Sequence, residues 1–124
     1  MFCKKYAVKN CRIIVGRAEV LGQAALRQSY DIVFSRALSK LRTALELSGC
    51  FVKVGGLLIV PHGTSWDSEL KESSLAMEIL GLKLLSNLAY DLGDVKFCAL
   101  IFLKVSVTPA IYPRPTGVPD KKPL

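Results

Sequence analysis

Two short apolar runs without polar alternation constrain the fold of this chain most strongly. The first is Tyr30–Phe34 in "YDIVFSRAL", and the second is Leu57–Val60 in "VGGLLIVPHG". A strand that faces water on one side alternates apolar and polar residues, whereas a strand that is covered on both faces does not. The two runs therefore predict buried strands of a parallel sheet, whose faces are covered by helices.

Apolar residues at helical spacing lie between these runs and predict a helix over residues 38–52. They are Leu38, Leu41, Leu45 and Phe51. The following pair, Gly55-Gly56, would close this helix, because glycine adopts the left-handed conformation of a C-terminal cap without strain. Upstream of the first run, the residues predict a short strand over Arg12–Val15 and one or two helical turns over Glu19–Gln28.

A pattern typical of a capping box opens the next helix. Thr64 and Asp67 lie three residues apart, ahead of apolar residues that would face inward. Those residues are Trp66, Leu70, Met77 and Leu80. Farther along the chain, Lys83–Leu92 and Val95–Val107 are strand-like and are separated by Gly93-Asp94, which predicts an antiparallel hairpin.

The order of these elements predicts the fold class and the organisation of the chain. Strands alternate with helices before the hairpin, so we expect an α/β fold whose sheet is mostly parallel with an antiparallel C-terminal hairpin. The 124 residues suffice for one domain at most. We expect its body over residues 1–107 and an extended, proline-rich basic tail over 108–124, where five of seventeen residues are prolines.

Positive charge is concentrated at the two ends of the chain. The net charge is +7; residues 1–17 carry five basic side chains and no acid, and residues 104–124 carry four against Asp120 alone. Basic ends favour a polyanion such as nucleic acid as the partner, although solubility charges would give the same pattern. The longest uncharged apolar run, Phe97–Leu103, is far below the roughly 18 residues of a membrane span. With no secretory signal at the start, we expect a soluble, cytoplasmic protein.

The cysteines and the single histidine show no metal-ligand spacing. Cys3, Cys11, Cys50 and Cys98 include no C-x-x-C pair, and His62 has no cysteine near it in sequence. We therefore interpret the cysteines as reduced core residues and expect no metal site. The chain also lacks a phosphate loop and a G-x-G-x-x-G motif.

Charged residues follow two of the three predicted parallel strands. "GRAE", residues 16–19, comes after the first strand, and Ser35-Arg36 comes after the second. In open α/β sheets, ligands bind at the carboxyl ends of the strands. Glu19 can accept a hydrogen bond from an amino or hydroxyl group, and Arg36 can hold a carboxylate or phosphate. Rim and helix-start residues often have the same character, so the spacing alone leaves the ligand open.

Four stretches, taken in order, resemble one known family. They are "GRAE", "YDIVFSRAL", "VKVGGLLIV" and "YPRPTGVPDKKPL". In order and spacing they are similar to the ribosomal RNA small-subunit methyltransferase G family, also called glucose-inhibited division protein B. The resemblance extends from Tyr6 to Leu124 and corresponds to the C-terminal half of the family.

The resemblance implies a partial class I, Rossmann-like methyltransferase sheet whose first two strands are missing. It implies S-adenosylmethionine as the cofactor and methylation of a guanine N7 in 16S rRNA of the small ribosomal subunit. Guanine N7 carries a free lone pair and needs no general base, so no catalytic residue is assigned. Ala18 and Glu19 would contact the adenine end of the cofactor, and Arg36 would be a further contact. Four basic residues would contact RNA: Arg17, Arg114, Lys121 and Lys122.

The sequence departs from the family pattern in three places. The glycine-rich cofactor loop and the acidic residue after the family's second strand are absent from these residues. His62 stands where the family usually has lysine, which puts an RNA contact there in doubt, and Val20 replaces a common second glutamate. We therefore expect this chain alone not to methylate RNA, and we expect the edge of Tyr30–Phe34 to favour association. A catalytically inactive RNA-binding remnant and one half of a split enzyme, paired with a separate N-terminal chain, are the alternatives.

Overall fold

Four strands form one sheet in the structure, a computed structural model that describes residues 9–36, 40–63 and 65–124. The strands are β1 (Tyr30–Phe34), β2 (Val52–His62), β3 (Leu82–Leu92) and β4 (Val95–Lys104). Their order across the sheet is β1-β2-β4-β3. β1 and β2 are parallel, whereas β4 is antiparallel to both of its neighbours. The expected α/β class with an antiparallel C-terminal hairpin is confirmed, and parallel pairing is confined to one pair of described strands.

The expected strand over Arg12–Val15 is not formed. This segment has no regular secondary structure, and the side chains of Ile13 and Val15 are exposed. A strand satisfies its backbone hydrogen-bonding groups through a neighbouring strand, and none of the described strands is paired with this segment. The β-branched residues alone therefore do not produce a strand here.

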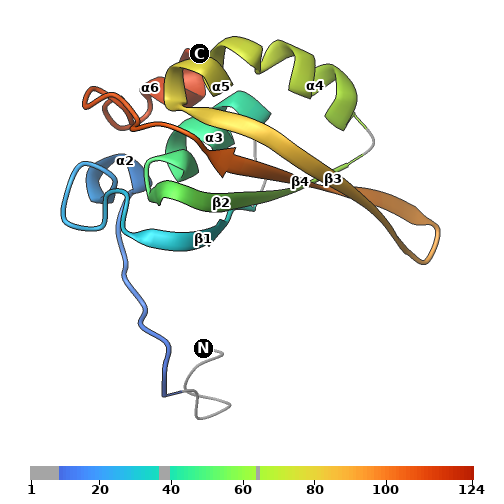
Figure 1. Cartoon of the computed structure of the whole chain (residues 1–124), viewed down its shortest axis with the longest axis horizontal. Helices are drawn as coiled ribbons and strands as arrows, with labels where there is room; N and C mark the ends of the chain where they lie inside the picture. The colour runs from blue at the N-terminus through green and yellow to red at the C-terminus, as the bar shows by residue number, and fades with distance from the viewer. Residues whose placement is uncertain (1–8, 37–39, 64) are drawn as a thin grey trace.

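The strand over Tyr30–Phe34 is confirmed, but the expectation that it is buried is wrong. Among the described strands, β1 lies at one edge of the sheet and pairs only with β2. Ile32 and Phe34 are 53% and 73% exposed, whereas Val33 packs against the core. The reason is that the helices α3, α4, α5 and α6 all cover the same face of the sheet (Figure 1). Residues of β1 that point to the opposite face therefore meet no covering layer.

The helix expected over residues 38–52 is α3 (Leu41–Gly49), and it packs Leu41 and Leu45 into the core. The expected cap at Gly55-Gly56 is wrong, because both glycines lie inside β2. Gly55 has a φ of +89°, and the pairing of β1 with β2 shifts register at this level. A Cβ on Gly56 would lie 2.6 Å from the backbone oxygen of Asp31. The two glycines thus allow an irregularity in the strand.

The helix expected after Thr64 consists of two helices, α4 (Trp66–Glu72) and α5 (Ser74–Leu80). At their junction the Ser73 hydroxyl donates a 2.7 Å hydrogen bond to the backbone oxygen of Glu69. The four residues expected to face inward, Trp66, Leu70, Met77 and Leu80, all pack on the core. The capping box is not observed, because Thr64 lies outside the described residues and no side chain caps α4.

The hairpin is confirmed, with Leu92 facing Val95 across the turn at Gly93-Asp94. β4 supplies the centre of the core, which also includes residues of α3, β2 and α5. Cys50 and Cys98 are buried and free of disulfides, as expected for core residues, whereas Cys11 is exposed. Cys3 lies outside the described residues. No helix in the described ranges is long and apolar enough to cross a membrane.

The segment after β4 folds back onto α3, so the expectation of an extended tail is wrong. It ends in the short helix α6 (Val118–Lys121). Thr108 is buried and donates its hydroxyl to the backbone oxygen of Leu80 at 2.8 Å. Thr43 on α3 donates in the same way to Pro119 at 3.0 Å. Proline content predicts an irregular backbone here, but it does not exclude packing; the division of the chain at residue 107 stays a prediction.

Candidate functional site

Glu19 is buried on α2 (Ala18–Leu21), a single helical turn that confirms the turns expected in this region. Its Oε1 accepts hydrogen bonds from Nη2 of Arg17 at 3.1 Å and from the backbone N–H of Gly117 at 3.2 Å. Burial works against ionisation, but backbone hydrogen bonds and the Arg17 guanidinium outweigh it and lower the pKa of Glu19. Glu19 is therefore a fixed anionic acceptor that joins α2 to the C-terminal segment.

The "GRAE" stretch lies at the end of the sheet where β1 and β2 begin (Figure 1). Gly22, the residue after α2, is buried against Cys50, which precedes β2. A Cβ on Gly22 would lie 2.5 Å from the Cys50 sulfur. Because the strand expected over Arg12–Val15 is not formed, this stretch does not follow the carboxyl end of a described strand. Its expected position at that edge of the sheet is therefore wrong.

Arg36 lies at the opposite end of β1. It is exposed and follows Ser35, whose backbone N–H donates to the oxygen of Ile59 on β2 at 3.0 Å. Residues 37–39, which follow, lie outside the described residues. The structure therefore does not bring Glu19 and Arg36 together. Their cofactor contacts, and that of half-buried Ala18, stay predictions.

His62 ends β2 and is held by a carboxylate that sequence reasoning did not connect to it. Its Nε2 lies 3.1 Å from Oε2 of Glu69, and the same oxygen accepts the backbone N–H of Leu41 at 2.8 Å. A carboxylate accepts hydrogen bonds, so Nε2 is the donor of this pair. Nδ1 is buried and has no hydrogen-bond partner among the residues that the structure describes. His62 therefore links the carboxyl end of β2 to α4 and to the start of α3.

Arg114 was expected on a loosely packed segment, but in the structure it is fixed by Glu46 of α3. Its Nη2 and Nε lie 2.8 and 3.1 Å from the two carboxylate oxygens, and its backbone N–H donates to Oε2 at 2.8 Å. Glu46 is fully buried, and its hydrogen bonds to Arg114 raise the pKa of the guanidinium. Arg114 therefore anchors the C-terminal segment, and its contact with RNA stays a prediction.

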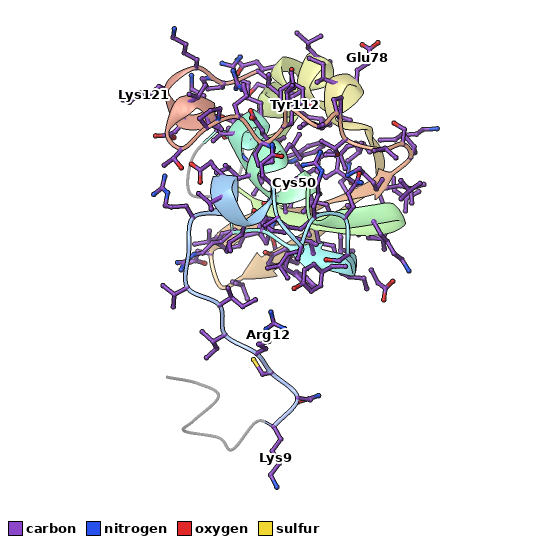
Figure 2. All side chains as sticks on the ribbon, turned by 90° about the vertical axis from the view of Figure 1, so that its left-hand side faces the viewer. Lys9, Arg12, Cys50, Glu78, Tyr112 and Lys121 are labelled. Atoms are coloured by element: carbon purple, nitrogen blue, oxygen red, sulfur yellow. The ribbon has the colours of Figure 1, made fainter. Side chains whose placement is uncertain are left out.

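The other basic residues expected to contact RNA lie at the surface. The Arg17 side chain is 65% exposed, and Lys121 and Lys122 are exposed near the end of the chain. Arg17 and Gly117 share one oxygen of Glu19, which brings Arg17 next to the segment that leads into α6. Arg12, by contrast, lies on an N-terminal segment that extends away from the body (Figure 2). The positively charged residues from the two ends of the chain therefore come together only in part: Arg17 lies next to the C-terminal segment, whereas Arg12 does not.

Two cations, half-buried Arg27 and buried Lys104, were not expected from the sequence to have a structural role. Arg27 donates to backbone oxygens of the loop after α2 and of the C-terminal segment: Gly22, Thr108, Pro109 and Tyr112. Lys104 is fully buried, and its Nζ donates to the backbone oxygens of Gly49 at 2.7 Å and Val52 at 3.2 Å. Burial lowers the pKa of Lys104 to about 8. No local pattern marks either residue, because all of their acceptors except the backbone oxygen of Gly22 are distant in sequence.

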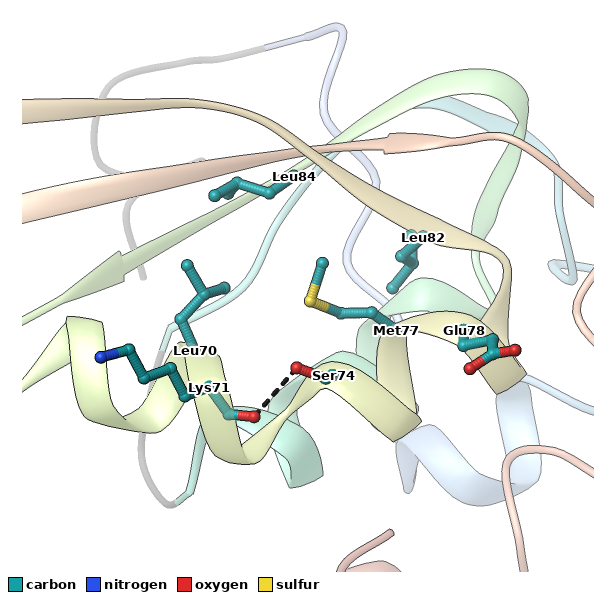
Figure 3. A pocket seen from close by; sticks show the side chains of 7 residues that line it. All are labelled: Leu70, Lys71, Ser74, Met77, Glu78, Leu82 and Leu84. Carbon is teal, nitrogen blue, oxygen red and sulfur yellow. Dashed lines mark hydrogen bonds between the residues drawn. The ribbon is translucent and has the colours of Figure 1, made fainter.

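Two surface hollows are lined by none of the predicted cofactor residues. One, of about 470 Å³, lies between the two helices α4 and α5 and β3, and Figure 3 shows Leu70, Met77 and Leu84 directed into it. The other, of about 240 Å³, is lined by Gly63 and Trp66 together with residues of the hairpin. The second hollow begins directly after His62, so it lies at the carboxyl end of β2.

A family model described as GidB, rRNA small subunit methyltransferase G, matches residues 1–96. The chain belongs to this family. Two curated relatives are named ribosomal RNA small subunit methyltransferase G. The one from Fervidobacterium nodosum is 39% identical over 123 residues, which cover 98% of this chain and 58% of the relative. The one from Streptococcus pyogenes is 36% identical over 127 residues, which cover all of this chain and 53% of the relative. The resemblance of the four stretches is thus confirmed.

The chain spans somewhat more than half the length of these methyltransferase G relatives. Among solved structures, it is similar to a T. thermophilus 16S rRNA N2 G1207 methyltransferase in complex with AdoMet and guanosine. That match has a TM-score of 0.48 and 18% identity, and it covers 77% of this chain and 24% of the other. Membership of the methyltransferase G family rests on the sequence matches.

Proposed function

We propose that this chain forms part of an S-adenosylmethionine-dependent methyltransferase that acts in the cytoplasm on guanine N7 of 16S rRNA. The observation that carries the proposal is the family match over residues 1–96, supported by 39% identity along nearly the whole chain. Both curated relatives are named as methyltransferases of small-subunit ribosomal RNA. The net charge of +7 suits an RNA substrate.

The residues present suit the chemistry of the cofactor, although they do not enclose it. Glu19 is an anion held in place by hydrogen bonds, and its carboxylate only accepts hydrogen bonds. It therefore suits an amino or hydroxyl group of an adenosine, which donates them. Ala18 beside it is half-buried and has a small side chain. The exposed guanidinium of Arg36 suits a carboxylate. When bound, the cofactor supplies an electrophilic methyl group. Our proposal is that Ala18 and Glu19 hold the adenine end and that Arg36 is a further contact.

The proposed reaction requires no general base from this chain. Methyl transfer to guanine N7 would form an N–C bond as the methyl carbon–sulfur bond of the cofactor breaks. The sulfur would leave as a neutral thioether and the purine would carry the positive charge, so no residue of this chain would have to remove a proton. Positioning of the base is then the main requirement. Holding the reactants in the correct orientation can remove a large part of the activation barrier. Among the described residues, Arg17, Lys121 and Lys122 are the exposed cations that we propose to contact RNA phosphates. Arg114 supports them by fixing the C-terminal segment to Glu46.

A cell-based experiment tests the proposal and separates its alternatives. The portion of the Streptococcus pyogenes relative outside its aligned region is fused to this chain and expressed in cells that lack their own enzyme of the family. Mass spectrometry of 16S rRNA then measures 7-methylguanosine. We expect methylation from the fusion and none from this chain alone. A fusion that folds and binds S-adenosylmethionine but leaves guanine N7 unmodified would contradict the proposal.

Supplying the same two parts as separate chains distinguishes a split enzyme from an inactive remnant. A split enzyme predicts that the separate chains restore methylation. An RNA-binding remnant predicts that this chain binds RNA but that neither the fusion nor the separate chains modify it. The control is the fusion with Leu75→Asp, because Leu75 is exposed on α5 and is none of the predicted cofactor or RNA residues.

A further inference from the structure

The helix α2 carries the two residues that we propose to hold the adenine end of the cofactor, but it is too short to fix its own position. It has four residues, and no side chain caps its start at Arg17. A single helical turn restricts several backbone dihedral angles for few hydrogen bonds, so it is unstable on its own. The positions of Ala18 and Glu19 therefore depend on what packs against this turn.

The C-terminal segment, residues 108–124, holds α2 at both of its ends. At the start of the helix, the backbone N–H of Gly117 donates to Oε1 of Glu19 at 3.2 Å. Just beyond its end, Nε2 of Gln23 donates to the backbone oxygen of Pro113 at 2.9 Å. The two segments are far apart in sequence, so these bonds are tertiary contacts. A displacement of the C-terminal segment would therefore displace α2.

The C-terminal segment is in turn fixed to the body by two cations. Arg27 donates to the backbone oxygens of Thr108 and Pro109 at 2.8 and 2.9 Å. Farther along, Arg114 lies 2.8 Å from the carboxylate of Glu46, which is fully buried on α3. Separating this pair would leave a buried carboxylate without its cation, which is costly. The pair therefore holds the segment in one place directly before the residue that bonds to α2.

The direction of the Glu19 carboxylate is set by the residue that donates to it. Gly117 has a φ of +87°, a left-handed conformation that glycine adopts without strain. In this conformation its N–H points at Oε1 of Glu19, which also accepts from Arg17 at 3.1 Å. Oε2 takes part in neither bond. Gly117 thus orients the carboxylate through one oxygen and leaves the other oxygen out of the contact.

We infer that the C-terminal segment positions the cofactor contact of Glu19, with Arg114 fixing the segment and Gly117 holding the carboxylate. Arg114 and Gly117 are then positioning residues that act through Glu19 and need not touch the cofactor. The inference rests on the proposed function, because it uses the proposed contact of α2 with the adenine end. It adds that the affinity for the cofactor depends on residues about 100 positions farther along the chain.

Gly117→Ala in the fusion with the streptococcal portion tests the inference. A Cβ at this position meets no atom within 4 Å, so the substitution acts through the backbone conformation and not through a clash. The dissociation constant of S-adenosylmethionine, measured by isothermal titration, should rise about tenfold, as for the loss of one hydrogen bond to a charged group. The matched control is Gly93→Ala in the hairpin turn. Gly93 also has a positive φ and open space at its Cβ, and its substitution should leave the dissociation constant unchanged.

Combined substitutions show whether the effect acts through Glu19. Gly117→Ala and Arg114→Met should each weaken binding, but neither should weaken it further in a fusion that already carries Glu19→Ala. A general loss of stability would act equally in both backgrounds. Met77→Ala, which removes core packing on α5, controls for this, because it should lower stability and leave the dissociation constant unchanged. Circular dichroism verifies that every variant is folded at the temperature of the titration.

The 124-residue chain alone tests the first step without cofactor. Burial raises the pKa of Glu19, whereas the backbone hydrogen bonds of Glu19 and Gly117 and the Arg17 guanidinium lower it, with a net decrease. Carbon-13 NMR of the glutamate carboxyl groups measures this pKa. Gly117→Ala should raise the pKa of Glu19, and Gly93→Ala should leave it as it is.

Three results would overturn the inference. The first is a pKa of Glu19 that Gly117→Ala does not change. The second is a fusion in which Glu19→Ala weakens cofactor binding and Gly117→Ala does not. The third is a Gly117→Ala effect of the same size with and without the Glu19 carboxylate, which would show that Gly117 acts elsewhere. Unchanged affinity in Glu19→Ala would instead contradict the proposed cofactor contact itself, and the inference would fail with it.

Discussion

The stability of this protein should increase as the pH rises above about 8, because Lys104 is buried as an ammonium ion. Burial lowers its pKa in the folded chain from the ordinary 10.5 to about 8. Between these values the unfolded chain binds more protons than the folded chain, so the free energy of unfolding rises with pH. At 1.36 kcal/mol per pKa unit, the full effect is about 3 kcal/mol.

Cys50 opposes this effect at higher pH. Burial raises the pKa of its thiol from 9.0 to about 11, so the unfolded chain loses the thiol proton first. Above pH 9 this lowers the free energy of unfolding as the pH rises, by an amount similar to the gain from Lys104. The native chain should therefore gain about 1 kcal/mol between pH 8 and 9 and change little up to pH 10.5.

Urea unfolding from pH 7 to 10.5 separates the two groups. In Cys50→Ala the free energy of unfolding should continue to rise up to pH 10.5. In Lys104→Met the rise between pH 8 and 9 should vanish, and stability should fall above pH 9. Other titrating groups are common to all three chains and cancel in the comparison. The reasoning is refuted if the native chain and Lys104→Met have the same pH profile between pH 8 and 9.

Three further predictions follow from the ion pairs and exposed cations. Arg114→Met should lower the free energy of unfolding by about 3 kcal/mol, because it leaves the buried Glu46 carboxylate without its cation; a loss below 1 kcal/mol in urea unfolding would contradict this. In the fusion with the streptococcal portion, Glu19→Ala and Arg36→Ala should each weaken S-adenosylmethionine binding by about 1.5–3 kcal/mol. Isothermal titration measures this, and unchanged affinity in both variants would exclude these contacts. Lys121→Ala should reduce by about one the slope of log affinity for RNA against log salt, and an unchanged slope would remove it from the interface.

Strands and turns that depend on neighbouring residues were predictable from the sequence. The hairpin between β3 and β4 follows from two strand-like runs on either side of Gly93-Asp94, and the inward residues of α4 and α5 follow from their spacing. Gly55-Gly56 shows the limit of such reasoning. The conformational freedom of glycine serves a strand irregularity as well as a helix cap, and local sequence does not distinguish them.

The candidate site was less predictable, because it depends on contacts between distant residues. The rule that ligands bind at the carboxyl ends of strands applies to "GRAE" only if Arg12–Val15 forms a strand. Forming that strand requires a partner strand. The proline-rich segment was expected to be extended, because nothing near Arg114 in the sequence reveals its pairing with Glu46 on α3. The exposure of Phe34 on β1 likewise follows from the sheet having helices on one face alone.

The position of the transferred methyl group tests the central claim of this account most directly. The purified fusion of the streptococcal portion with this chain is incubated with labelled S-adenosylmethionine and small ribosomal subunits that lack the modification. The rRNA is then digested and the labelled nucleoside identified. We expect one methyl group per 16S rRNA, on guanine N7. Label on another atom or on another RNA, or none from a fusion that binds the cofactor, would contradict it.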